Sequence, residues 1–133
     1  MAYRSWLSLI WLAGAGICCA LLLVFAARDI ILFADIPPFL ERLMSIYLPI
    51  VAMIVGFWFA EKNAATEAPP TASRIAIGTS LAFNALMIVV LASTFWAESD
   101  PTALDVRMSV MSSYATYMAL LVGPAIGWFF GKQ

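Results

Sequence analysis

The stretch that decides the fold is residues 5–27, SWLSLIWLAGAGICCALLLVFAA, in which 23 consecutive residues carry no charge. The hydrocarbon core of a bilayer is roughly 30 Å thick, and about 20 helical residues are needed to cross it. No water is available in that core to satisfy backbone N–H and C=O groups, so a run of this kind must form a helix. Residues 5–27 are therefore predicted to be a membrane-spanning helix.

Three further uncharged runs follow, at residues 43–60, 75–97 and 108–131. They contain 18, 23 and 24 residues, and the four runs together hold 88 of the 133 residues. Each length falls within the range of about 17–25 that a spanning helix requires. The sequence thus predicts an all-α integral membrane protein, a four-helix bundle forming a single transmembrane domain over residues 1–133.

The composition excludes several classes of function. Hydrophobic residues make up 64% of the chain and charged residues only 11%, against about 25% charged in a soluble domain. The net charge of −1 provides no basic patch, so no nucleic-acid partner is expected. The chain has no histidine, and no acid or base lies within a span, so we expect no catalytic residues, no metal, no cofactor and no enzymatic activity. The same absence argues against an ion-coupled transporter.

The connections between the runs are short. Residues 28–42 mix apolar side chains with Asp29, Asp35 and Glu41, a composition that predicts a segment lying in the membrane interface. Residues 61–74 form a polar linker that contains consecutive prolines.

Four spans place both termini and the middle linker on one side of the membrane. That side carries Arg4, Lys62, Arg74 and Lys132, and the other carries Arg28, Arg42 and Arg107. The positive-inside rule then favours cytoplasmic termini, and we expect a bacterial inner (plasma) membrane. The small difference in basic residues also leaves a dual topology open.

The second and fourth spans end alike, in GFWFAEK at residues 56–62 and GWFFGK at residues 127–132. One interpretation is a duplicated helical hairpin, so that the bundle consists of two related hairpins. The alternative is that interfacial aromatic residues followed by a base are typical of any span.

The fourth run carries a stripe of small and weakly polar residues spaced three or four apart, which places them on one helix face. The stripe consists of Ser109, Ser112, Ser113, Thr116, Ala119, Gly123 and Gly127. Such a face favours close helix packing, or it lines a water-filled pore.

Asn84 is the most polar side chain near the middle of the third run, and Ser80 precedes it by one turn. An unpaired amide in hydrocarbon costs several kcal/mol, so Asn84 is expected to face a partner. Examples of such a partner are Ser112, Thr116 and Asn84 of another subunit. The interpretations are an interhelical hydrogen bond or a ligand contact.

Two prolines fall within the runs. Pro124 lies deep in the fourth run and removes the hydrogen bond to the Leu120 carbonyl, which makes it a candidate hinge as well as a static kink. Pro49 lies near the predicted start of the second run, where proline is tolerated.

Six acidic residues gather on the side opposite the termini. They are Asp29, Asp35, Glu41, Glu98, Asp100 and Asp105. With three arginines nearby, this side carries a net −3. In an oligomer these acids would form rings that concentrate cations. In the alternative, they pair with the adjacent arginines on a solvated face.

Two functions from different classes remain. The first is a homo-oligomeric channel or pore-type protein with an acidic non-cytoplasmic face. The second is a non-catalytic structural or accessory subunit of a larger membrane complex. The expected partners are therefore the lipid bilayer and either further copies of the chain or another membrane protein.

Overall fold

The computed structural model describes residues 2–60, 70–96 and 102–131. These residues form four long helices, α1 (Ala2–Ala27), α2 (Ile36–Ala60), α3 (Pro70–Ala92) and α4 (Ala103–Gly131), and two short 3-10 turns, η1 (Phe33–Asp35) and η2 (Ser93–Trp96). All four helices are long and apolar enough to cross a membrane. The predicted all-α bundle of four membrane-spanning helices is confirmed.

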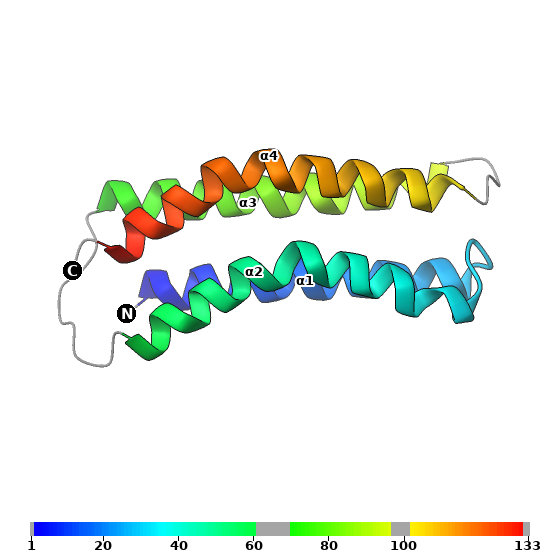
Figure 1. Cartoon of the computed structure of the whole chain (residues 1–133), viewed down its shortest axis with the longest axis horizontal. Coiled ribbons are helices and arrows are strands. Elements are labelled where there is room, and N and C mark those ends of the chain that lie inside the picture. The colour runs from blue at the N-terminus through cyan, green and yellow to red at the C-terminus, as the bar shows by residue number, and fades with distance from the viewer. Residues whose placement is uncertain (1, 61–69, 97–101, 132–133) are drawn as a thin grey trace.

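The helices are arranged as two antiparallel pairs. Figure 1 shows α1 beside α2 and α3 beside α4, with the start of α1 and the end of α4 at the same end of the bundle. Contacts between the two pairs run mainly along α1 and α3, and fewer join α2 to α4. The interior therefore lies along the α1–α3 seam.

Helix α2 begins earlier than the sequence predicted. The predicted interfacial segment 28–42 is shorter in the structure, because residues 36–42 already belong to α2. Pro37 and Pro38 fall in the first turn of the helix, where backbone N–H groups have no helical acceptor and their absence carries no penalty. Only residues 28–35 connect α1 to α2.

Pro49 consequently lies inside α2, so its predicted position near the start of the helix is wrong. Proline has no N–H group, and the Ser45 carbonyl one turn earlier loses its helical donor. Pro124 lies inside α4, so the second helix of each pair carries an interior proline.

The chain leaves α1 through a left-handed residue. Asp29 has a φ of 56°, a conformation that Asp and Asn adopt more readily than most residues. The Asp29 N–H donates to the Ala26 carbonyl at 3.1 Å, and the Ile30 N–H donates to the Phe25 carbonyl at 2.9 Å. This pattern satisfies the last carbonyls of the helix and turns the chain toward η1.

An aromatic cluster fills the interior where α1, α2 and α3 meet. The Trp11 ring lies 4.9 Å from the Phe83 ring and 5.9 Å from the Tyr47 ring, measured between centroids. Tyr47 and Phe83 are 6.1 Å apart and pack edge to face, a geometry that stabilises aromatic pairs. Each of the three side chains is almost completely buried.

Replacing Trp11 with alanine is expected to destabilise the bundle by about 3 kcal/mol or more, since the cavity left by a buried aromatic side chain is not refilled. The matched control is Trp6→Ala on the same helix, because Trp6 is 60% exposed. Unfolding of the helices in mixed detergent, followed by circular dichroism, measures both. An equal loss of stability in the two variants would contradict the central position of Trp11.

Candidate functional site

The predicted stripe on α4 lies on the outside of the bundle. Ser109, Ser112, Ser113 and Thr116 are all exposed, and Gly123 and Gly127 are half-buried. The opposite side of α4 supplies the buried contacts: Met108, Met111, Val122, Ile126 and Phe129. Within a single chain, the hydroxyls of the stripe therefore neither pack against another helix nor line a channel.

Two of the exposed hydroxyls bond to their own helix. The Ser113 hydroxyl donates to the Ser109 carbonyl at 3.1 Å, and the Thr116 hydroxyl donates to the Ser112 carbonyl at 3.0 Å. Bonds of this kind satisfy the hydroxyl donor without a partner from elsewhere. They lower the cost of placing the hydroxyls in hydrocarbon but leave oxygen lone pairs free to accept a hydrogen bond.

Helix α4 is more exposed than its polar composition would lead one to expect. It is the least apolar of the four spans and also the least buried, with 22% of its most apolar window inside the bundle against 28–33% for the others. Tyr114 and Tyr117 add two more polar tips to its exposed surface. If lipid were the only neighbour, the most polar helix would be expected in the interior, because lipid cannot satisfy polar groups.

Asn84 lies in the interior instead of facing the stripe. Its side chain is 5% exposed, and its amide nitrogen donates to the Ser80 carbonyl at 2.8 Å. The expectation that Asn84 would pair with Ser112 or Thr116 is wrong, because those residues lie on the outer face of α4. Its burial also removes it from contact with Asn84 of another subunit.

The Asn84 amide occupies a space that Gly14 leaves open. A Cβ atom on Gly14 would lie 1.6 Å from Asn84 Oδ1, so any larger residue would displace the amide. Among the described residues, Oδ1 has no hydrogen-bond partner, but its position against the Gly14 backbone permits a weak Cα–H···O contact. Sequence reasoning missed Gly14; the available signal was a small residue at mid-span on α1, opposite a polar one on α3.

Ser80 joins the same interior cluster. The Trp11 indole N–H donates to the Ser80 hydroxyl at 3.1 Å, and the Cys18 thiol lies 3.5 Å from the Tyr47 hydroxyl. These two contacts join α1 to α3 and α1 to α2. The arrangement holds helices together, and it contains no carboxylate or imidazole that would transfer a proton.

Among the acidic side chains predicted opposite the termini, those that the structure describes lie at the end of the bundle where α1 ends and where α2 and α4 begin. Arg42 Nη1 lies 2.6 Å from Asp105 Oδ1 and pairs α2 with α4. Among the described residues, Asp29, Asp35 and Glu41 have no ion pair. Glu98 and Asp100 lie outside the described residues. The ion pair of Asp105 is therefore with an arginine 63 residues away in the sequence, on another helix.

Pro124, the candidate hinge, is exposed on α4 between Gly123 and Gly127. A Cβ atom on either glycine would meet no heavy atom within 4 Å, so neither glycine is required by packing within the chain. In the part of the chain that the structure describes, no three acidic or cysteine side chains are close enough together to hold a metal ion.

The chain matches no protein family, no curated protein and no solved structure. The function is therefore argued from the outer face of α4, the interior cluster and the charged end of the bundle.

Substituting Gly14 with alanine tests the interior contact with Asn84. The new methyl group displaces the amide into a packed interior, and overpacking of this kind costs about 1–3 kcal/mol. Gly16→Ala is the matched control, since a Cβ there meets no atom within 4 Å. Detergent unfolding measures both variants. If Gly14→Ala is as stable as Gly16→Ala, the amide does not depend on Gly14.

Proposed function

We propose that the chain is a subunit of a homo-oligomeric membrane pore in which further copies cover the outer face of α4. The observation that carries the proposal is the exposure of α4, the least apolar span. Its serine and threonine hydroxyls lie within the membrane, where a neighbouring protein or water satisfies them better than lipid does.

A pore of this kind would run between copies rather than through one chain. The interior of the single bundle is filled by large side chains, including Trp11, Tyr47 and Phe83. Close-packed interiors of this kind leave no path for water or ions. In a ring of copies, α4 is the helix whose outward side chains are suited to a water-filled axis.

The charges at one end suit a preference for cations. Asp29, Asp35 and Glu41 are exposed and have no ion pair among the described residues. Repeated around an axis, carboxylates concentrate cations at a pore mouth. The proposal places this end on the non-cytoplasmic side of a bacterial inner membrane and the termini in the cytoplasm.

A second candidate is an accessory subunit without transport activity. The half-buried Gly123 and Gly127 and the self-bonded hydroxyls on α4 favour this alternative, because small-residue faces allow another helix to approach closely. In that case the outer face of α4 contacts an unlike membrane protein. Neither candidate assigns the chain a catalytic activity.

A cysteine placed on the outer face of α4 tests both candidates. Ser112→Cys is made in a chain whose native thiols are replaced by Cys18→Ser and Cys19→Ala. The control is Val89→Cys, which is exposed on α3 at a similar depth. Oxidation in reconstituted membranes is expected to cross-link Ser112→Cys into dimers and to leave Val89→Cys monomeric.

Labelling of the same variant with a water-soluble maleimide separates the two candidates. A pore predicts that Ser112→Cys is labelled before oxidation and that Val89→Cys is not. Cross-linking without labelling would contradict a water-filled axis and favour packing alone. A Ser112→Cys chain that stays monomeric would contradict self-association through α4.

A further inference from the structure

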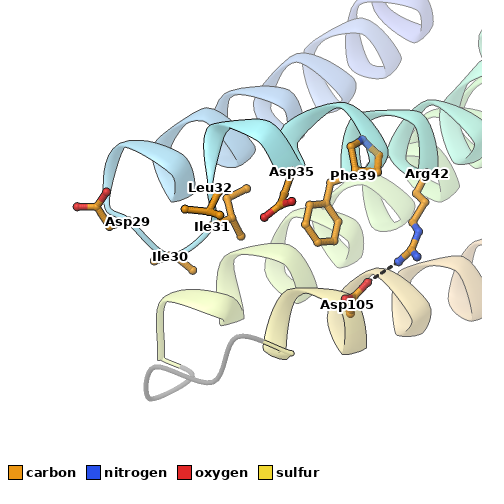
Figure 2. Close-up of a pocket in the computed structure, with 9 residues that line it drawn as sticks. Asp29, Ile30, Ile31, Leu32, Asp35, Phe39, Arg42 and Asp105 are labelled. Carbon is orange, nitrogen blue, oxygen red and sulfur yellow. Dashed lines mark hydrogen bonds and ion pairs between the residues drawn. The ribbon is translucent and has the colours of Figure 1, made fainter.

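A pocket of about 490 Å³ lies at the charged end of the bundle. Figure 2 shows it between the turn that follows α1, the start of α2 and the start of α4. Its charged lining consists of Asp29, Asp35, Arg42 and Asp105. Among the described lining residues, Asp105 is the one on α4, one turn before Ser109, and the other charged lining residues come from the turn after α1, from η1 and from α2. What the pocket binds is inferred from its own lining and not from the proposed pore.

The two ends of the pocket differ in charge. Asp35 ends η1, just before α2 begins at Ile36, and Phe39 and Arg42 follow three residues apart on one face of α2. Figure 2 shows the Asp35 carboxylate on one side of the Phe39 ring and the Arg42 guanidinium on the other. The pocket therefore presents an anion and a cation, separated by an aromatic wall.

Both charged groups can still bind a ligand. Asp35 has no ion pair among the described residues. Arg42 uses Nη1 for Asp105, and both of these side chains remain 57% exposed. A guanidinium has five N–H donors, so Arg42 retains donors for an anion.

Apolar residues complete the lining of the pocket. Ile31, Leu32 and Phe39 are among them, and Leu32 and the neighbouring Phe33 are 72% and 66% exposed. Large apolar side chains exposed together indicate a surface that contacts lipid or protein.

The depth of the pocket matches the headgroup region. The 25 residues of α2 rise about 37 Å at 1.5 Å per residue, which exceeds a hydrocarbon core of roughly 30 Å. Glu41 and Arg42 are charged and exposed, and hydrocarbon excludes charges, so we place the first turns of α2, which carry Phe39 and Arg42, in the headgroup layer.

We propose that this pocket binds the headgroup of a zwitterionic aminophospholipid. The primary ammonium group donates hydrogen bonds to the Asp35 carboxylate, and the phosphate accepts them from the free N–H groups of Arg42. The acyl chains extend inward from the phosphate, past Arg42 and along the outer surface of the bundle. Asp29, at the outer end of the pocket, adds negative potential that favours the ammonium group and opposes anionic lipids.

Lipid retention measured by native mass spectrometry tests the proposal, using the delipidated full chain and one added phospholipid at a time. We expect an ethanolamine phospholipid to be retained more strongly than a choline phospholipid with the same acyl chains, because a trimethylated ammonium donates no N–H bond. Equal retention of the two lipids, or stronger retention of a glycerol phospholipid, would overturn the proposal.

Asp35→Asn tests the residue assignment in the same measurement. Asparagine has nearly the same shape as aspartate, and Asp35 is exposed, so the helical content by circular dichroism is expected to stay unchanged. The expected loss of ethanolamine-lipid retention is about fivefold to tenfold. The matched control is Glu41→Gln, an exposed acid on α2 that does not line the pocket. Wild-type retention by Asp35→Asn would overturn the assignment.

A soluble competitor separates a lipid from a free amine as the ligand. Added O-phosphoethanolamine has the same ammonium and phosphate groups but no acyl chains. The proposal expects it to displace the lipid only at a concentration well above that of the lipid. Displacement at equal concentration would overturn the lipid as the ligand, because the apolar side chains would then contribute nothing.

Discussion

In hydrocarbon, every polar group has to be satisfied by the protein, and the rest of this structure depends on that constraint. It makes each uncharged run a helix, because a helix pairs its own backbone groups. It also accounts for the interior contacts between Trp11 and Ser80 and between Cys18 and Tyr47. Among the described residues, Asn84 Oδ1 and the Thr94 hydroxyl are the buried side-chain oxygens that lack a hydrogen-bond partner.

The same constraint makes α4 the unusual helix. In the interior, the Asn84 amide nitrogen donates a hydrogen bond to the Ser80 carbonyl, and the amide oxygen occupies the space that a side chain on Gly14 would fill. On the surface, α4 exposes hydroxyls and tyrosines although it is the least apolar span. A bundle complete in itself would turn that face inward and expose α1, the most apolar helix. The outward direction of this polar face is the reason for proposing that further copies cover it.

The sequence predicted the four spans well because charges are excluded from hydrocarbon, and their positions mark where each span ends. It predicted the start of α2 too late, because Arg42 interrupts the apolar run while the helix continues into the headgroup layer, beginning at Ile36. The misplacement of Pro49 followed from the same error. A charge marks the edge of the hydrocarbon and not the end of a helix.

Spacing placed the α4 residues on one face, but it did not show which way the face points. On a membrane helix most faces are apolar, so hydrophobic periodicity does not separate the inside from the outside. The prediction that Asn84 pairs with Ser112 or Thr116 was wrong for this reason, since both residues face outward. Gly14 and Trp11 were missed because their roles depend on which residues of α2 and α3 lie opposite them.

The central claim is that further copies of this chain cover the outer face of α4 in the membrane. The most direct test is the mass of the complex extracted from its native membrane in lipid nanodiscs. Our account predicts a multiple of the 14.5 kDa chain, two copies or more, without an unlike subunit. A single 14.5 kDa chain carrying only lipid, or one chain bound to an unlike protein, would contradict it.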